Sequence, residues 1–280
     1  MIIEQQTLDG RPLVLNLPDP TAGPTAYILG VHKAGSVLFN GIVQGICAAA
    51  GRATFDLEPQ VFGQGVPMRD CPLEAAALLE REGYVFTGFR APWLLGYVRR
   101  YRQAKKLLIV RDPRDIAVSF YFSMASSHRV PTEGAARGDV LKLREMAQTS
   151  DVSAFVLAAR ANPIFQNLNV FLHQIHRYPG FVVYRYEDVI FAKREWSEKI
   201  AAELEIDLPR AVVHAIADRH DIIPTEEDPD QHVRQVTPGN YKKHLDRDAI
   251  QLIEERCAAI FDRFHYRRDG ETRKRADAPL

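Results

Sequence analysis

Short apolar runs that suit buried strands alternate along this chain with longer segments of helical periodicity. Four runs are clear and a weaker one lies between the first two, so that in chain order they occupy residues 26–31, 53–57, 84–89, 106–111 and 181–186. Strands with continuous apolar runs, separated by helices, are typical of a parallel sheet that is covered on both faces. We therefore predict an α/β fold with a single domain, in which a parallel β-sheet is flanked by helices on both faces.

The segments between these runs supply the helices of the predicted fold. Apolar residues at helical spacing predict helices at residues 35–50 and 92–102, and a third that follows Arg111 and runs through Phe120. A length of 280 residues suits one large domain with at most a small appendage.

Other segments look less regular. Residues 126–150 contain proline and glycine and are predicted to form a mobile insertion, and residues 221–240 are predicted to form a long loop. We expect the domain itself to occupy residues 20–265. Residues 1–19 would then be an N-terminal extension, and residues 266–280 a charged, flexible tail.

The composition limits the class of protein. Lys plus Arg and Asp plus Glu both number 36, and this balance argues against a general nucleic-acid binder. Cys47, Cys71 and Cys257 are too few and too widely spaced for a disulfide framework or a metal cluster, so we interpret them as reduced thiols, with Cys47 in the core. The N-terminus does not resemble a signal peptide, and no stretch approaches the ~20 apolar residues of a membrane span. We expect a soluble, cytoplasmic protein.

The loop after the first strand is the first candidate site. Right-handed crossovers place every strand-to-helix loop at one edge of such a sheet, where ligands bind. Residues 30–36 (GVHKAGS) lead into a helix, whose N-terminal N–H groups hold phosphate well. Lys33 adds a charge, Gly35 allows close approach of the backbone, and Ser36 adds a hydroxyl. This is not a Walker A loop, in which the Lys follows the second Gly. Taken alone, the segment could equally be a strand–helix turn with a surface lysine.

Residues 111–119 (RDPRDIAVS) form the second candidate site. Arg111 ends a predicted strand, and Pro113 stands where a helix could begin. Ser119 lies eight residues beyond Arg111, two helical turns into that helix. The two side chains could therefore converge on one phosphate. The alternative is a capped helix with surface ion pairs.

These segments resemble motifs of the sulfotransferases that use 3′-phosphoadenosine 5′-phosphosulfate (PAPS). Residues 33–36 look like the 5′-phosphosulfate loop of that family, and residues 111–119 look like its 3′-phosphate motif, with the same gap between Arg and Ser. Residues 186–188 (YED) resemble the segment whose Tyr contacts the adenine. Residues 234–245 (RQVTPGNYKKHL) are similar to the C-terminal loop, RKGxxGDWKNHF in cytosolic members. The motifs occur in the order that the family has.

The resemblance implies a P-loop-NTPase-like sulfotransferase fold, PAPS as donor, 3′-phosphoadenosine 5′-phosphate (PAP) as product, and no metal. The acceptor would be a hydroxyl or an amine on a small molecule, a lipid or a glycan. Some positions depart from the family pattern, since Val37 replaces a common Thr, Leu38 replaces a Trp, and Gln235 with Val236 replaces Lys-Gly. The residues that the resemblance places on the donor are Lys33, Ala34, Gly35, Ser36, Val37, Arg111, Ser119, Tyr186, Arg234 and Gln235.

The catalytic base is the main departure from the family pattern. Cytosolic members carry a His in a KTHLP-like segment, and the comparable segment here (GFRAP) has Arg90, which is always protonated and a poor base. Other sulfotransferase groups use a Glu just past the second strand. Asp56 and Glu58 lie 23 and 25 residues beyond Lys33, which would stabilise the leaving group. We therefore expect Glu58 or Asp56 to be the base, with His32 as the alternative.

Two other functions remain open at this stage. One is a nucleotide-dependent kinase of related fold, although the sequence has no Walker A motif. The other is a catalytically inactive PAP-binding or scaffold protein, which would account for the missing His. His173 and His176 have the i,i+3 spacing of a ligand pair, but no further Cys or carboxylate cluster supports a metal.

Overall fold

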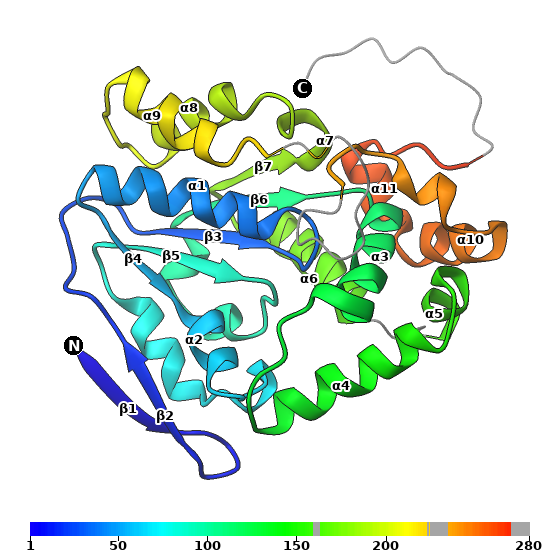
Figure 1. The fold of residues 1–280 in the computed structure, drawn as a ribbon. Coiled ribbons are helices and arrows are strands. Elements are labelled where there is room, and N and C mark those ends of the chain that lie inside the picture. Colours follow the sequence, from blue (N-terminus) through cyan, green and yellow to red (C-terminus); the bar gives the residue numbers. More distant parts are fainter. Residues whose placement is uncertain (159–162, 223, 225–234, 270–280) are drawn as a thin grey trace.

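The computed structural model describes residues 1–158, 163–222, 224 and 235–269. Within these residues a five-stranded parallel sheet has the order β4-β5-β3-β6-β7, which confirms the predicted fold class (Figure 1). Each strand begins and ends within one residue of its predicted limits. The strands are β3 (Ala26–Gly30), β4 (Ala53–Asp56), β5 (Tyr84–Phe89), β6 (Lys105–Val110) and β7 (Phe181–Arg185).

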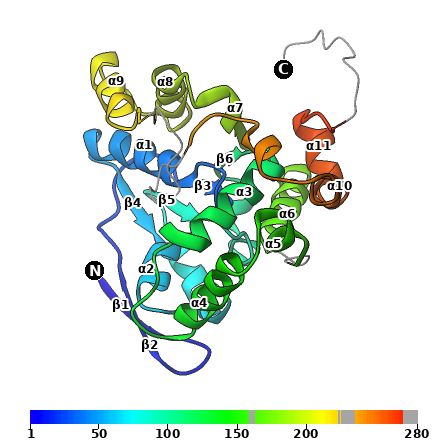
Figure 2. The same ribbon diagram turned by 45° about the vertical axis from the view of Figure 1, so that its right-hand side comes forward.

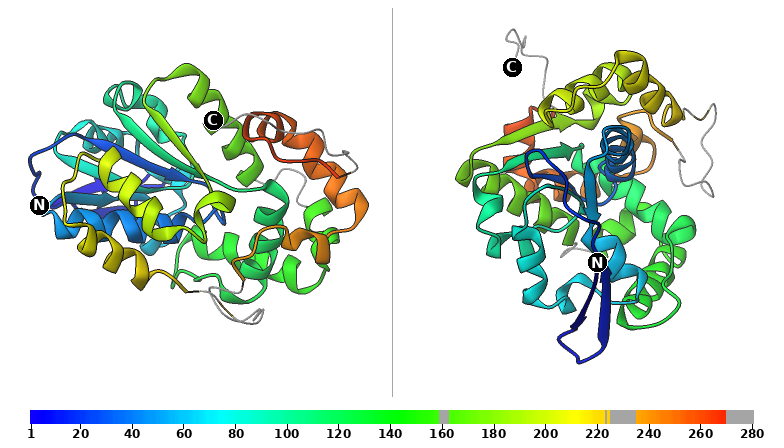
Figure 3. Two further views of the ribbon diagram at one scale, coloured as in Figure 1. Left: turned by 90° about the horizontal axis from the view of Figure 1, so that it is seen from above. Right: turned by 90° about the vertical axis from the view of Figure 1, so that its left-hand side faces the viewer.

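Helices cover both faces of this sheet, as Figure 3 shows from two directions. Alternate side chains of β3 point to opposite faces, so Ala26 and Ile28 belong to one core while Tyr27 and Leu29 belong to the other. The first core is covered by α1 (Ser36–Ala49), α8 (Lys193–Glu203) and α9 (Arg210–Arg219). The larger core is covered by α2 (Leu57–Gly63), α3 (Pro113–Phe122), α4 (Ala135–Gln148), α5 (Val152–Ala158), α6 (Pro163–Arg177), α10 (Arg247–Arg256) and α11 (Ala258–Phe264).

The helices that follow β3 and β6 lie on opposite faces of the sheet. Figure 2 shows the two helices, and the inward side chains of α1 belong to one core whereas those of α3 belong to the other. Because β3 and β6 are neighbours, the loops that leave them diverge at the carboxyl edge of the sheet. Open α/β sheets bind their ligands at such a point.

The N-terminal residues form an antiparallel hairpin, β1 (Ile2–Gln6) and β2 (Pro12–Asn16). Its inward leucines join the larger core, and its free edge is closed by side chains instead of by another strand. Gln64 accepts from and donates to the backbone of Val14, at 3.0 and 2.7 Å. Gln60 does the same for Asn16, at 2.7 and 3.2 Å. Two glutamines one helical turn apart on α2 thus imitate a neighbouring strand.

The prediction of one helix at residues 92–102 was wrong, and a helix that was not predicted lies within residues 126–150. Residues 92–102 form two 3₁₀ turns, η3 (Leu94–Tyr97) and η4 (Arg100–Arg102), because Glu80 accepts the backbone N–H groups of Arg99 and Arg100 and interrupts a helix there. Residues 126–150 contain the 14-residue helix α4, whose sparse buried residues left a weak apolar pattern.

Two expectations from composition can be compared with the structure. All three cysteines are buried free thiols, and Cys47 lies in the core as predicted. No helix in the described ranges is long and apolar enough to cross a membrane.

Candidate active site

The loop between β3 and α1 is wound tightly at the carboxyl edge of the sheet. Lys33 and Gly35 both have left-handed backbone conformations, with φ values of 66° and 89°. The first-turn amides of α1 have no intrahelical acceptors, and no acidic side chain occupies this turn. Uncompensated amides at a helix N-terminus, beside a lysine, suit a phosphate or sulfate group.

Arg111 connects this loop to the ends of β6 and β7. Its Nη1 donates to the carbonyl oxygen of Lys33 at 3.2 Å. Its guanidinium carbon lies 4.3 Å from the ring centroid of Tyr186, and its Nη2 lies 3.9 Å from Asp115 Oδ2. The Nε of Arg111 is buried without a hydrogen-bond partner among the residues described. The guanidinium is thus fixed in position while one donor stays unused.

Tyr186 follows β7 and begins the short helix α7 (Tyr186–Val189). Its hydroxyl donates to the carbonyl oxygen of Val236 at 3.1 Å, which brings the C-terminal loop to the same place. Its ring packs on Gly35, where an added Cβ would lie 2.8 Å from a ring carbon. Glycine is therefore required at this position both for its positive φ and for the close approach of the ring.

Asp115 fixes the C-terminal loop from the other side. Its Oδ2 accepts from the N–H of Gly239 at 2.7 Å, and its Oδ1 accepts from the N–H of Tyr241 at 2.9 Å. Together with Arg111 and Tyr186, this carboxylate joins all four segments that the sequence singled out. We did not identify Asp115 from the sequence, although it stands inside the RDPRD segment.

Arg114 is a second residue of that segment whose role the sequence did not reveal. It is 2% exposed, and it donates to Asp112 at 2.7 Å, to Glu254 at 2.6 Å and to the carbonyl of Arg267 at 2.8 Å. The helix is capped as the alternative interpretation expected, because Asp112 accepts from the N–H of Arg114. The ion pairs of Arg114, however, are buried and not on the surface.

Glu187, next to Tyr186 on α7, supports the loop that follows β6. Its Oε1 accepts from the N–H of Asp112 at 2.8 Å, and its Oε2 accepts from the hydroxyl of Tyr266 at 3.1 Å. Burial raises the pKa of Glu187, and the hydrogen bond from the backbone N–H of Asp112 opposes this. The residue positions the loop after β6, so the YED segment contributes more than its tyrosine.

Glu58 lies at the ends of β4 and β5, on the other side of β3. It is 5% exposed, and it stands in the first turn of α2. Its Oε2 accepts from the N–H of Arg90 at 2.8 Å, and its Oε1 accepts from the N–H of Ala91 at 3.1 Å. Burial raises the pKa of Glu58 to about 7, while the charge of Arg90 and the two backbone hydrogen bonds oppose the rise.

Asp56 ends β4 and turns toward α1. Its Oδ2 accepts a hydrogen bond from the side-chain amide of Gln44. Its Oδ1 is buried without a hydrogen-bond partner in the described part of the chain. Burial raises the pKa of Asp56, and the hydrogen bond from Gln44 and the charge of Arg90 oppose this.

His32 is half-buried in the loop before Lys33, and its ring centroid lies 6.5 Å from that of His128. Burial lowers the pKa of His32 well below its usual value, and the charges of Arg90, His128 and Lys33 act in the same direction. The imidazole is therefore neutral at physiological pH.

The remaining predicted donor residues occupy different surroundings. Ala34 and Ser36 are buried in the loop, and Val37 is 54% exposed in the first turn of α1. Ser119 is half-buried on α3, and Gln235 is half-buried before Val236. Arg234 lies outside the described residues.

The structure also places the two histidines that have the spacing of a ligand pair. His173 and His176 are exposed on α6, and within the described ranges no group of three His, Cys, Asp or Glu side chains could hold a metal ion.

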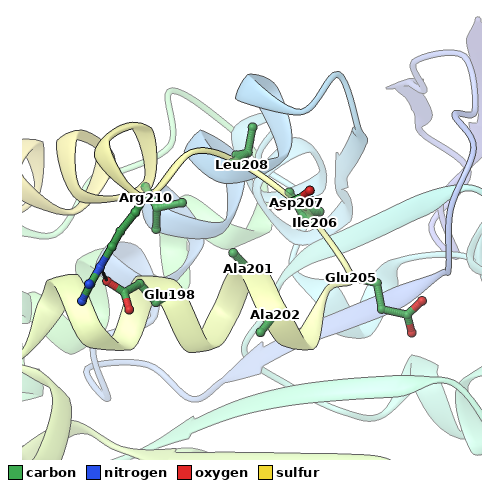
Figure 4. Close-up of a pocket in the computed structure, with 9 residues that line it drawn as sticks. Glu198, Ala201, Ala202, Glu205, Ile206, Asp207, Leu208 and Arg210 are labelled. Carbon is green, nitrogen blue, oxygen red and sulfur yellow. Dashed lines mark hydrogen bonds and ion pairs between the residues drawn. The ribbon is translucent and has the colours of Figure 1, made fainter.

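A shallow hollow of about 510 Å³ lies between α8 and the start of α9 (Figure 4). Glu203, near this hollow, pairs with Lys105 at the start of β6, so the hollow lies away from the carboxyl edge.

Comparisons with known proteins identify the family and the fold. The family model for the sulfotransferase domain matches residues 98–265, more than half of the chain. The mouse sulfotransferase SULT7A1, solved in complex with PAP, is 15% identical over 86% of each chain, with a TM-score of 0.57. Retinol dehydratase, solved with androsterone and the inactive cofactor PAP, is 14% identical over 91% of this chain and 84% of its own, with a TM-score of 0.48. No curated protein matches the sequence.

Proposed function

We propose that this chain, which belongs to the sulfotransferase domain family, transfers a sulfuryl group from PAPS to a hydroxyl or an amine of an acceptor. The observation that carries the proposal is the position of Arg111. Its guanidinium contacts both the carbonyl of Lys33 and the ring of Tyr186, whose hydroxyl reaches Val236. Four segments that are distant in the sequence thus meet where a donor with two phosphate groups would lie.

The donor would extend along the ends of β3, β6 and β7. The first-turn amides of α1 and the ammonium of Lys33 would hold the 5′-phosphosulfate, with Ala34, Gly35, Ser36 and Val37 around it. The 3′-phosphate would be held by side chains of the second and fourth segments, which are Arg111, Ser119, Arg234 and Gln235. Tyr186 would contact the adenine, as the resemblance of residues 186–188 to the family motif implies.

The reaction would be a direct displacement at sulfur. The acceptor oxygen forms a bond to sulfur while the bond from sulfur to the bridging phosphate oxygen breaks, and the negative charge moves onto PAP. Lys33 would stabilise this charge as it develops. As in phosphoryl transfer, positioning and electrostatic stabilisation would supply most of the rate.

Glu58 is the residue that we propose as the general base. A base is most effective when its pKa lies near the operating pH, and burial raises the pKa of Glu58 to about 7. The N–H groups of Arg90 and Ala91 each use one lone pair of a carboxylate oxygen and hold the group still, which leaves other lone pairs for the acceptor proton. Asp56 turns toward Gln44, and the lowered pKa of His32 makes it a weak base, so these two are the alternatives.

Two measurements test the proposal. Calorimetric titration should show PAP binding more tightly than ATP, since a kinase of related fold would show the reverse order. Release of PAP from PAPS in the presence of a panel of small-molecule, lipid and glycan acceptors should then show turnover. Tight PAP binding without turnover for any acceptor class would instead identify a catalytically inactive PAP-binding protein.

The three free thiols agree with a cytoplasmic location, which fractionation of cells would test.

A further inference from the structure

Arg90 follows β5 directly, and β5 lies beside β3, whose outgoing loop carries His32 and Lys33. The backbone of Arg90 is fixed on both sides. Its N–H donates to Glu58 at 2.8 Å, and its carbonyl oxygen accepts from the side-chain amide of Asn167 on α6 at 3.3 Å. The starting point of the side chain is therefore held by two different helices.

The side chain of Arg90, in contrast, has no partner among the residues that the structure describes. It is half-buried, yet its guanidinium makes no hydrogen bond and no ion pair within the part of the chain that the structure describes. Other half-buried arginines are paired, since Arg100 binds Glu80 and Glu82, and Arg144 binds the carbonyls of Met124 and His128. An arginine that is fixed by its backbone and unpaired at its guanidinium is suited to bind something other than this chain.

The carboxylates that follow β4 make their hydrogen bonds with groups other than the guanidinium of Arg90. Both oxygens of Glu58 accept from peptide N–H groups, and Asp56 Oδ2 accepts from Gln44, whereas Asp56 Oδ1 has no partner among the described residues. The positive charge of Arg90 lowers the pKa of Glu58 and Asp56, which opposes the effect of burial. It also lowers the pKa of His32, in the same direction as burial. Arg90 and the three candidate bases thus follow the neighbouring strands β4, β5 and β3, and the guanidinium of Arg90 makes no hydrogen bond within the described residues.

We propose that Arg90 binds an oxyanion on the acceptor, so that the substrate carries a carboxylate or a phosphate near its nucleophilic hydroxyl. This inference rests on the proposed sulfotransferase function. A guanidinium presents paired donors that match both kinds of oxyanion, and it cannot lose its charge. With the oxyanion on Arg90, the hydroxyl would be directed between Glu58, which takes its proton, and the sulfur of a donor held at Lys33.

Matched acceptors that differ only in charge test the inference. Hydroxy acids, their methyl esters and the corresponding hydroxyalkyl phosphates are compared by kcat/KM at saturating PAPS. We expect the charged acceptors to exceed the esters by about ten- to a hundredfold, the range for one charge-assisted pair. Carboxylate and phosphate arms show which oxyanion is preferred, and preference for either supports the inference.

Two variants separate this role from a structural one. Arg90→Gln should raise the KM for charged acceptors and leave the KM for the esters unchanged. The preference for charged acceptors over esters should then disappear. Arg90→Lys should keep part of it, because lysine supplies a charge without the paired donors. Arg99→Gln is the matched control, since Arg99 is exposed a few residues further along, and the preference should survive there.

Three results would overturn the inference. The esters could be used as well as the acids by the unmodified protein, the preference could survive in Arg90→Gln, or this variant could lose kcat equally with every acceptor while KM for the charged acceptors stays unchanged. The last result would place Arg90 on the sulfuryl group of the donor. PAP affinity distinguishes these outcomes from failure of the proposed function, because a protein that binds PAP and sulfates only neutral alcohols retains the function without the inference.

Discussion

The two halves of the sheet's carboxyl edge are built differently. On one side, the ends of β3, β6 and β7 are joined by Arg111, Asp115 and Tyr186, which tie four distant segments together. On the other side, the ends of β4 and β5 are joined mainly by Glu58, through two backbone N–H groups. We refer to these as the donor half and the acceptor half.

The difference follows from the ligands that each half would hold. A donor with fixed phosphate groups needs cations, a helix N-terminus and glycine at set spacings, and such needs leave short motifs in the sequence. An acceptor molecule with a hydroxyl group needs only a pocket of suitable shape, a general base and a charged residue. The donor half is therefore crosslinked by its own residues, whereas the acceptor half keeps Arg90 unpaired within the described residues.

The largest effect is expected at Lys33, which lies between the two halves. If it stabilises charge on the leaving PAP, Lys33→Ala should lower kcat by about 10²–10³, the range for losing one preorganised electrostatic contact. PAP affinity should fall much less, because the contact strengthens in the transition state. Lys142→Ala on the exposed side of α4 is the control. Turnover near that of the unmodified protein would show that Lys33 does not act on the leaving group.

Glu58→Gln tests the acceptor half alone. Losing a general base costs about 10²–10⁴ in rate, so kcat should fall at least about a hundredfold while the dissociation constant for PAP stays unchanged. Asp56→Asn and His32→Ala are made in parallel. If His32→Ala abolishes turnover and both amide variants remain active, the base is His32. A fall in PAP affinity with Glu58→Gln would mean that the two halves are not independent.

Arg111→Ala tests the donor half alone. A charge-assisted hydrogen bond is worth ~1.5–3 kcal/mol, so PAP should bind about ten- to a hundredfold more weakly. Binding of adenosine 5′-phosphosulfate, which lacks the 3′-phosphate, should barely change. Equal losses for both ligands would show that Arg111 acts only by holding the loop through the carbonyl of Lys33.

The same contrast explains how much the sequence could predict. The parallel sheet and its strand limits came from continuous apolar runs, which depend only on burial at each position. The convergence of Lys33, Arg111 and Tyr186 was predictable because each stands at the end of a strand. Contacts between side chains and distant backbone groups leave no periodic pattern. The sequence therefore did not indicate that Asp115 holds the C-terminal loop or that Gln64 closes the edge of β2.

Titration of Glu58 gives the smallest expected effect and the sharpest test of the acceptor half. With a pKa of about 7, its carboxyl is mostly protonated near pH 6 and mostly ionised near pH 8. Only the ionised form accepts a proton, so kcat should rise about tenfold across this interval. The neutral His32 would not produce this rise, because its lowered pKa keeps it deprotonated throughout the interval.

Protein stability should move in the opposite direction to kcat, over a pH range that begins lower and overlaps with the first. The pKa of Glu58 in the folded chain exceeds the ordinary value of 4.5, so the folded state binds this proton more tightly than the unfolded state. That contribution to the free energy of unfolding is lost as pH rises from about 4.5 to about 7. Glu58→Gln has no titrating carboxyl group at this position. It should therefore flatten the dependence of kcat on pH and the dependence of the melting temperature on pH. If kcat still rises tenfold in this variant while its stability profile flattens, Glu58 is the titrating group but not the base.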